Sequence, residues 1–493
     1  MKYFVGIDLG TSSVKLLLVA GDGTVLNSVT EYYPVIYPRD GWSEQNPEDW
    51  YNGTINGIKK LMNGFPRENV AGIGVGGQMH GLVLLDKDDK VVRPCILWND
   101  GRTEQETAYL NDIVGRNRLS EYTANIAFAG FTAPKILWLK KNEPENFNKT
   151  VKIMLPKDYL VYRLCGAFTT DCSDASGTLF FDVKNRDWSP DMCRLCGIRE
   201  DILPKIRESS EPVGTLKPEV AELLGLPLYV TVCAGAGDNA AAAIGTGTIK
   251  NGDCNISLGT SGTVFISKDE FSVDENNSLH SFAHANGKYH LMGCILSAAS
   301  ALGWWTENIL NTSDFAAEQA GAETFAGRNN LFFLPYLTGE RSPHNDVNAR
   351  GAFIGLNPSV TRRQMTLAVM EGVAFALRDC VEIAKSCGAP VTRTRICGGG
   401  AKSPLWRQII ADVLNVPVET PATREGPAYG GAMLAAVACG EFKDVQDVTE
   451  RFVTIEETVY PCAERAAFYD IRYKVFKKLY PALKDVYKEL REA

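Results

Sequence analysis

Residues 4–20, FVGIDLGTSSVKLLLVA, join a short apolar run to a longer one through Gly10-Thr11-Ser12. Residues 254–267, CNISLGTSGTVFIS, repeat this pattern, and the shared Leu-Gly-Thr-Ser begins at Leu9 and again at Leu258, 249 residues later. An apolar run, a Gly-Thr-Ser turn and a β-branched run predict two strands joined by a tight turn. The repeat therefore predicts a duplicated hairpin at the head of each half of the chain.

Strand and helix patterns alternate after each predicted hairpin. In the first half, Gly21-Asp22-Gly23 and the alternating run 24–30 extend the hairpin into an antiparallel meander. Elsewhere the apolar spacing predicts helices over residues 47–61, 361–385 and 404–414, and strands over residues 70–75, 82–85, 228–234 and 394–397. The predicted fold class is therefore α/β, with mixed sheets covered by helices in two lobes.

The boundary between the two lobes is predicted in the Gly/Thr-rich stretch 245–252, because no Ser- or Pro-rich linker separates the halves. This gives an N-terminal domain at 1–248 and a C-terminal domain at 249–493. Two α/β lobes joined by a short hinge are expected to meet across a cleft, where ligands of such proteins usually bind.

The composition is that of a soluble globular protein with more than one domain. The chain has 493 residues, of which 45 % are hydrophobic and 22 % charged. Its 51 basic residues are outnumbered by 59 acidic ones, so no excess positive charge is available for binding nucleic acid. The N-terminal apolar run is too short for a signal peptide, and no stretch has the length of a membrane span. We therefore expect no membrane association and a cytoplasmic location.

Thirteen cysteines are scattered through apolar runs, and their odd number and low density argue against a disulfide framework. The CxxC pair, Cys193 and Cys196, has no second pair or nearby His to complete a tetrahedral zinc site. His280 and His284 have the spacing of helical metal ligands, but their surroundings predict a strand, and no HExxH glutamate accompanies them. We therefore expect buried thiols and no metal site at these two histidines.

Asp8 stands near the end of the first predicted strand, just before Gly10 and the hydroxyl run Thr11-Ser12-Ser13. Backbone N–H groups and hydroxyls in such a turn suit phosphate oxygens, and Asp8 can hold a phosphate-bound Mg²⁺ ion. An Asp-Gly hairpin turn without a ligand would give the same short pattern. The second copy, Gly259-Thr260-Ser261-Gly262, favours two loops that clamp a polyphosphate, although neither copy has the Gly-Lys-Ser/Thr ending of a Walker P-loop.

Asp238 follows a predicted strand and the glycine-rich turn 234–237, and it precedes a predicted helix that begins with small residues, 240–243. A helix N-cap with a lowered carboxylate pKa is the structural alternative. A cap alone does not explain the small residues on both sides of this carboxylate, which would let a ligand approach the backbone closely. A carboxylate in that place can accept a hydroxyl proton during phosphoryl transfer.

Three further segments have the composition of binding sites. Gly398-Gly399-Gly400-Ala401-Lys402-Ser403 joins a predicted strand to a predicted helix, where glycines let a phosphate or a flat ring reach the main chain, although a loop without a ligand would look similar. The segments 76–81, GGQMHG, and 96–102, ILWNDGR, place polar side chains beside Met and Trp. This combination suits a sugar, although a single His in a glycine loop is also common as a structural residue.

Together these motifs resemble those of the FGGY carbohydrate kinases, and among them the kinases that act on D-xylulose. The resemblance extends over essentially the whole chain. It is carried by GIDLGTSSVK (6–15), WSEQNPEDW (42–50), GQMHG (77–81), ILWNDGR (96–102), GFTAPKILWL (130–139), LPKDYL (155–160), GDNAAA (237–242), SLGTSG (257–262), FLPYLTGERSPH (333–344), MEGVAFAL (370–377) and GGGAKS (398–403).

The resemblance implies two actin- and hexokinase-like domains of the ribonuclease H type, which close on ATP, Mg²⁺ and a sugar. It implies that Asp238 is the general base that deprotonates the attacking hydroxyl, and that Asp8 positions the metal and the phosphates. The implied sugar-binding residues are Met79, His80, Trp98, Asn99, Asp100, Asp238 and Asn239. The implied nucleotide-binding residues are Gly10, Thr11, Ser12, Ser13, Lys15, Gly259, Thr260, Gly399, Gly400, Ala401 and Ser403.

The implied partners are ATP and D-xylulose, which would be phosphorylated to D-xylulose 5-phosphate. The sequence leaves the oligomeric state open, with a homodimer among the alternatives. Two other functions also stay open: an FGGY kinase for another ketose or polyol, such as L-ribulose or glycerol, and a non-catalytic actin-like nucleotide switch. The switch would leave the sugar-like segments and Asp238 unexplained.

Overall fold

The computed structural model describes residues 1–423 and 425–492, which form two compact units. Unit 1 comprises residues 1–249, 281–290 and 425–453, and unit 2 comprises the described residues of 250–280, 291–424 and 454–493. Each unit contains a mixed sheet with helices, so the predicted α/β class is confirmed. The predicted domain boundary at 248/249 stays a prediction.

The sheet of unit 1 begins with the predicted meander, in which each strand is antiparallel to the next: β1 (Tyr3–Leu9), β2 (Ser13–Ala20) and β3 (Val25–Tyr32). On the other side of β1 lie the parallel strands β5 (Val70–Gly77) and β14 (Thr231–Cys233), followed by the antiparallel edge strand β13 (Pro212–Thr215). A short strand, β15 (Ala236–Gly237), also pairs in parallel with the end of β5. The sheet thus gathers segments from both ends of residues 1–249.

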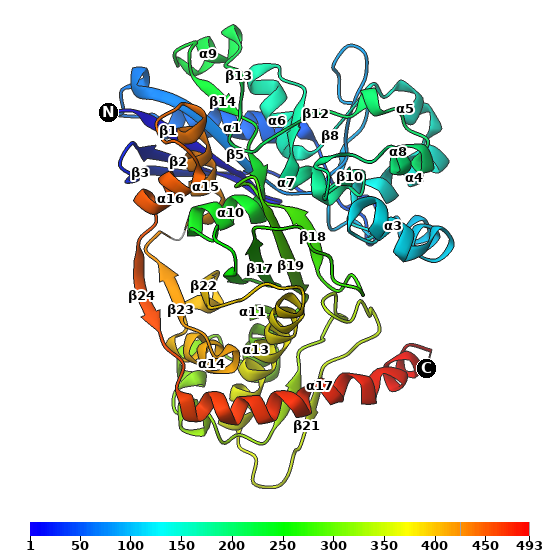
Figure 1. Ribbon diagram of the computed structural model, residues 1–493, viewed down its shortest axis with the longest axis vertical. Helices are drawn as coiled ribbons and strands as arrows, with labels where there is room; N and C mark the ends of the chain where they lie inside the picture. Colours follow the sequence, from blue (N-terminus) through cyan, green and yellow to red (C-terminus); the bar gives the residue numbers. More distant parts are fainter. Residues whose placement is uncertain (424, 493) are drawn as a thin grey trace. The chain divides into compact units, whose positions relative to one another are not determined.

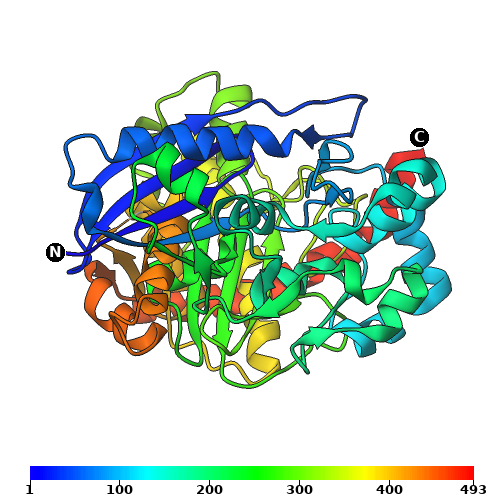
Figure 2. The same cartoon turned by 90° about the horizontal axis from the view of Figure 1, so that it is seen from above.

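Two helices pack on opposite faces of the meander. The predicted helix α1 (Pro47–Leu61) lies against β2 and β3, and Figure 2 shows it in blue across the blue strands. The far side of β1 receives α15 (Gly426–Ala438), drawn in orange beside these strands in Figure 1. A Cβ added to Gly6 of β1 would lie 1.9 Å from the Ala428 carbonyl oxygen, so α15 rests directly on the strand backbone.

Helix α10 (Asp238–Thr246) packs against α15 as closely as α15 packs against β1. A Cβ on Gly430 of α15 would lie 1.9 Å from the Ala241 carbonyl oxygen, and a Cβ on Gly245 would lie 2.2 Å from the Gly426 carbonyl oxygen. The two helices therefore meet backbone to backbone, and glycines make this contact possible.

Unit 2 contains the second predicted hairpin, β16 (Asp253–Leu258) and β17 (Gly262–Lys268). β22 (Arg393–Cys397) lies parallel to β16, as β5 lies parallel to β1, and β23 (Val418–Pro421) and β24 (Ile455–Val459) complete that side. Each first strand thus has an antiparallel partner on one side and a parallel partner on the other. The duplication indicated by the repeated tetrapeptide is present in both sheets.

Two long helices of unit 2 begin within a residue of their predicted starts. α13 (Arg362–Ser386) starts with a capping box between Thr361 and Gln364, and α14 (Pro404–Leu414) starts at Pro404 behind the N-cap Ser403. Together with α17 (Ala463–Glu492) they enclose an apolar core around Phe375. His280 begins the strand β18 (His280–Ala283), which pairs with β19 (Tyr289–Ile295), so His280 is not on a helix.

Two predicted segments differ from the structure. The predicted strand 228–234 is paired only at Thr231–Cys233, because the preceding residues turn: the Val230 N–H donates to the Pro227 carbonyl, and Leu228 and Tyr229 are exposed. The predicted hinge 245–252 is partly helical, since α10 continues to Thr246 and ends at Gly247 in the left-handed region.

Cys193 and Cys196 are buried free thiols, as predicted. Within the part of the chain that the structure describes, we find no helix that combines the length and the apolar character of a membrane span.

Candidate functional site

The carbonyl groups of the turn between β1 and β2 accept hydrogen bonds from side chains of unit 1. The Gly10 N–H closes the turn on the Ser13 carbonyl at 3.0 Å. Tyr33 donates its hydroxyl to the Gly10 carbonyl at 2.6 Å, and Gln45 Nε2 donates to the Thr11 carbonyl at 2.5 Å. With its carbonyl groups engaged in this way, the turn is suited to present N–H groups and hydroxyls to an anion.

A buried pair of amides links this turn to the segment 76–81. Gln78 Nε2 donates to Gln45 Oε1 at 3.1 Å, and Trp50 Nε1 donates to the same oxygen at 3.1 Å. The Gln78 N–H also donates to the Leu9 carbonyl at 2.8 Å. The predicted phosphate turn and the predicted sugar segment are therefore one hydrogen-bonded assembly. Gln45 and Trp50 lie in the quoted segment 42–50 but were not among the predicted site residues.

The register of the sheet brings Asp8 and Asp238 to the same edge. Asp8 of β1 pairs with Gly76 of β5, and Ala236 of β15 pairs with Gly76 as well. The three strands are parallel, so their carboxyl ends share one edge, where ligands of open α/β sheets bind. Asp238 follows β15 directly as the first residue of α10.

Both carboxyl groups have raised pKa values. Burial is the main cause for Asp8; the charges of Asp238 and Glu425 add to it, that of Lys15 opposes it, and the resulting pKa is about 7. Burial raises the pKa of Asp238 to about 6, although the backbone N–H and side-chain amide of Asn239 donate to its Oδ1 at 2.7 and 2.8 Å. A group with a pKa of about 6 is mostly ionised at pH 7 and can accept a proton.

The donor set at this edge fits Mg²⁺. That ion prefers oxygen ligands and is usually held by one or two carboxylates together with phosphate oxygens and water. Asp8 and Asp238 supply carboxylates, and their raised pKa values reflect buried negative charge that a cation would relieve. Lys15, opposite Asp8 on β2, forms an ion pair with Glu425, the residue before α15.

Met79 and His80 lie next to the turn that delivers Asp238. A Cβ on Gly237 would come within 3.0 Å of Met79 Cγ and Sδ, so the thioether packs on the backbone before Asp238. His80 has φ 68°, its ring stacks on Phe131 at 4.6 Å, and its Nδ1 lies 2.7 Å from the Gly177 carbonyl oxygen. Because a carbonyl only accepts, Nδ1 carries the proton in the neutral ring.

The main chain of His80 is held by α4 (Thr132–Asn142). Lys135 Nζ donates to the His80 carbonyl at 2.9 Å, and Thr132 Oγ1 donates to the same oxygen at 3.1 Å. Burial lowers the pKa of Lys135 to about 7. These two residues lie in the quoted segment 130–139 and fix the left-handed backbone of His80.

The segment 98–100 divides into an exposed and an enclosed part. Trp98 is 40 % exposed and donates Nε1 to Thr11 Oγ1 at 3.0 Å, so its indole borders the first turn. Asn99 Oδ1 accepts from Ser43 Oγ at 2.7 Å. The Asp100 side chain is fully buried and pairs with Arg102 at 2.8 and 2.7 Å. Trp98 and Asn99 can reach a ligand, whereas the Asp100 carboxylate is engaged within the protein.

The carbonyl groups of the turn between β16 and β17 also accept hydrogen bonds, as those of the first turn do. The Gly259 carbonyl accepts from the Ala299 N–H at 2.9 Å. The Thr260 carbonyl accepts from the Ala298 N–H at 3.0 Å and from Ser300 Oγ at 2.7 Å, both at the start of α11 (Ala299–Gly303). Unit 2 therefore repeats the arrangement that suits an anion.

A cavity of about 660 Å³ lies beside the glycine loop of unit 2. Its apolar wall includes Leu302 and Phe315, and its other residues include Gln319, whose Oε1 accepts from Ser403 Oγ. A Cβ on Gly399 would meet nothing within 4 Å, so the loop is open to a ligand. Size and lining suit a flat heterocyclic base. Helix α12 (Phe315–Gln319) was not predicted, because five residues are too few to show a periodic pattern.

Ala401 differs from its neighbours in the loop. Gly399, Gly400 and Ser403 line the large cavity, whereas Ala401 lines a second cavity of about 260 Å³ on the side of Cys397 and Thr420. Its carbonyl accepts from Arg407 Nη1 at 2.8 Å.

Two family models match most of the chain. The model of the N-terminal domain of the FGGY family of carbohydrate kinases matches residues 3–245, and that of the C-terminal domain matches residues 254–439. The xylulose kinases of Bacillus subtilis (strain 168) and Escherichia coli (strain K12) are 39% and 41% identical over 490 and 483 residues, which cover 99% and 97% of this chain and 98% and 99% of those proteins. The crystal structure of a xyloylose kinase from Brucella ovis is 39% identical, with a TM-score of 0.93 over 98% of this chain and 100% of that chain.

Proposed function

This chain belongs to the FGGY family of carbohydrate kinases, and we propose that it transfers the γ-phosphate of ATP to D-xylulose, giving D-xylulose 5-phosphate and ADP. The observation that carries the proposal is the meeting of Asp8 and Asp238 at one sheet edge, next to Met79 and the first glycine turn. A proton acceptor, a cation ligand and an anion-binding turn are the parts that phosphoryl transfer to a hydroxyl requires.

Asp238 acts as the general base. Its carboxylate accepts the proton of the terminal hydroxyl of the sugar as the hydroxyl oxygen attacks the γ-phosphorus. The bond between that phosphorus and the bridging oxygen of ADP breaks, and Asp238 then returns its proton to water. The pKa of about 6 and the two hydrogen bonds from Asn239 support this role, because they keep an ionised carboxylate in a fixed direction.

The sugar is bound by Met79, His80, Trp98, Asn99 and Asn239. Met79 and Trp98 provide apolar surface for the carbon skeleton, and the others provide hydrogen-bonding groups for its hydroxyls. Asp100 acts indirectly in this proposal: its ion pair with Arg102 fixes the segment that carries Trp98 and Asn99.

The phosphates of ATP are bound by Gly10, Thr11, Ser12, Ser13 and Lys15 and by Gly259 and Thr260. Asp8 would hold a Mg²⁺ ion, which supplies neutralisation of the phosphate charge. The adenine base occupies the 660 Å³ cavity at Gly399, Gly400 and Ser403. Residues 1–248 thus supply the sugar site, the first phosphate-binding turn and the general base Asp238, and residues 249–493 supply the rest of the nucleotide site.

A coupled ADP-release assay with D-xylulose, L-ribulose and glycerol tests the proposal. We expect the highest kcat/KM for D-xylulose and at least a tenfold lower value for glycerol, because a three-carbon polyol leaves buried polar groups unpaired at about 1–3 kcal/mol each. A higher kcat/KM for another acceptor would contradict the assignment of D-xylulose. If no acceptor caused ADP release, the proposed kinase activity itself would be contradicted.

A further inference from the structure

The backbone that delivers Asp238 is anchored by three segments outside the predicted substrate and nucleotide residues. The anchors act on residues 234–237, between β14 and α10. The anchors are three hydrogen bonds. Lys157 Nζ donates to the Ala234 carbonyl at 3.1 Å, the Gly235 N–H donates to the Ser209 carbonyl at 3.0 Å, and the Gly237 N–H donates to Ser173 Oγ at 3.1 Å.

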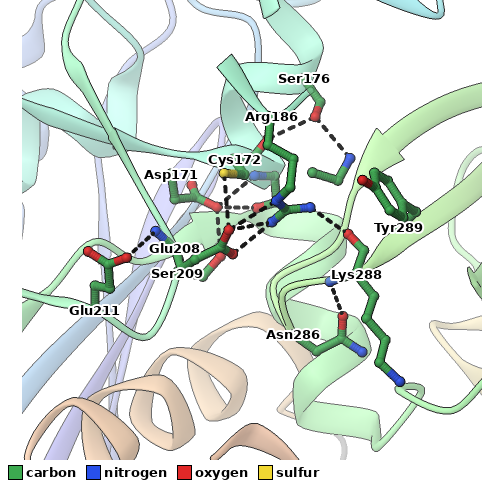
Figure 3. Close-up of polar contacts among 12 residues, drawn as sticks. Asp171, Cys172, Ser176, Arg186, Glu208, Ser209, Glu211, Asn286, Lys288 and Tyr289 are labelled. Carbon is green, nitrogen blue, oxygen red and sulfur yellow. Dashed lines mark hydrogen bonds and ion pairs between the residues drawn. The ribbon is translucent and has the colours of Figure 1, made fainter. Parts of the chain in front are cut away.

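The anchor at Ser173 is itself fixed by Asp171. Ser173 donates its hydroxyl to Asp171 Oδ2 at 2.5 Å and its backbone N–H to the same oxygen at 2.9 Å. Ser209 Oγ donates to that oxygen as well, at 2.8 Å, and Figure 3 shows the carboxylate of Asp171 directed toward Ser209. Because the Ser173 hydroxyl proton goes to Asp171, its lone pairs are left to accept from Gly237.

Asp171 forms a buried ion pair with a lysine that it shares with two other carboxylates. Asp171 Oδ1 lies 3.2 Å from Lys157 Nζ, which also lies 2.6 Å from Asp158 Oδ1 and 3.9 Å from Asp174 Oδ2, and all four side chains are buried. A buried ion pair that is supported by several hydrogen bonds holds its members in one geometry, and removal of one partner is costly. Asp171 is therefore a rigid support for Ser173.

Gly237 needs a hydrogen bond from another segment to fix its backbone, because it has no side chain. A side chain at this position would crowd Met79, since a Cβ would lie 3.0 Å from Met79 Cγ and Sδ. A glycine is also the residue with the most backbone freedom, and Gly237 is the N-cap of α10, directly before Asp238. The torsion angles at Gly237 thus contribute, together with the hydrogen bonds from Asn239, to the direction of the Asp238 carboxylate.

We propose that Ser173, held by Asp171, is a positioning residue for Asp238: it fixes the Gly237 N–H and thereby aims the carboxylate at the acceptor hydroxyl. The inference rests on the proposed function, in which Asp238 is the general base. A displacement of about 1 Å of a reacting group can lower a rate by about 10²-fold.

The first test is Ser173→Ala. We expect kcat to fall roughly 10- to 100-fold while KM for D-xylulose and ATP stays within about threefold. Ser189→Ala is the matched control, because Ser189 is also buried and its Oγ also accepts a backbone N–H, from Met192 at 3.3 Å. It should lose similar thermal stability and keep kcat within about twofold. An unchanged kcat in Ser173→Ala, or an equal fall in Ser189→Ala, would overturn the inference.

The second test combines Ser173→Ala with Asp238→Asn. A residue that acts only through Asp238 should not lower further the residual rate of Asp238→Asn, measured at high enzyme concentration. A further 10- to 100-fold loss in the double variant would show a general structural role and overturn the inference. Near-normal turnover of Asp238→Asn alone would instead overturn the base assignment, so the two failures are distinguishable.

Discussion

The carboxylate of Asp238 is the group on which the proposed chemistry depends. We expect Asp238→Asn to lower kcat by about 10²–10⁴-fold and to leave KM for D-xylulose and ATP within a few-fold, because an amide has nearly the same shape but cannot accept the proton. Steady-state kinetics of the purified variant measure this. Turnover close to that of the unmodified protein would place the base elsewhere.

Asp8 should make stability depend on pH. Its pKa of about 7 lies above the value of about 3.9 in an unfolded chain. The folded state therefore binds the proton more tightly, and this group costs stability progressively as pH rises from about 4 to about 7. We expect Asp8→Asn to be more stable than the unmodified protein at pH 8, by about 1–3 kcal/mol.

The stability gain of Asp8→Asn should shrink toward pH 4, where Asp8 is protonated in the folded state and about half protonated in the unfolded chain. Thermal unfolding of both proteins at pH 4, 5 and 8 measures the difference. A gain of the same size at all three pH values would show that the buried charge is not its cause.

The contact between α10 and α15 is sensitive to a single added carbon atom. We expect Gly430→Ala to destabilise the protein by about 1–3 kcal/mol, because its Cβ would lie 1.9 Å from the Ala241 carbonyl oxygen. Since α10 carries Asp238, kcat should fall as well. Thermal unfolding and steady-state kinetics measure the two effects.

Gly303→Ala in α11 is the control for this substitution. Gly303 is also a helical glycine, but a Cβ there would meet nothing within 4 Å, so its replacement should be neutral or slightly stabilising. Equal stability of the two variants would contradict the close packing of α10 on α15.

Local patterns predicted the elements with strong signals at their ends. α1 and α14 begin at Pro47 and Pro404, and α13 begins behind the capping residue Thr361, so their bounds agree with the predictions to within a residue. The run 228–234 was mispredicted because apolar residues also occur in exposed turns, as Leu228 and Tyr229 do. Sequence periodicity contains no information about such tertiary context.

The candidate site was predicted where one short segment contains the chemistry, and missed where distant segments meet. Asp8, Asp238 and Met79 were identified from local motifs and the family resemblance, and the sheet register brings the two acids to one edge. Ser173, Gln45 and Phe315 were missed, because each is defined by contacts across many residues. Such contacts depend on sheet pairing and helix packing, which single-sequence patterns do not specify.

Both units contain the same feature, a hairpin turn whose carbonyl groups accept hydrogen bonds from other residues of the same unit. In unit 1 the donors are Tyr33 and Gln45, and in unit 2 they are the backbone N–H groups before and within α11, together with Ser300. The duplicated turns provide two phosphate-binding sites, and Asp8 and Asp238 provide the carboxylates. Together they support the proposed transfer of a phosphoryl group from a nucleotide to a sugar.

The most direct test of this claim is ³¹P NMR of the purified protein mixed with ATP, Mg²⁺ and D-xylulose. The account predicts loss of the γ-phosphate signal of ATP and appearance of ADP and of a phosphomonoester. Its phosphorus should couple to two methylene protons that in turn couple to H4, which places the phosphate on C5 rather than on C1, whose neighbour is the ketone. The same mixture with Asp238→Asn should show almost no product in the same time. Release of inorganic phosphate without a sugar phosphate, or the same product at the same rate with Asp238→Asn, would contradict the account.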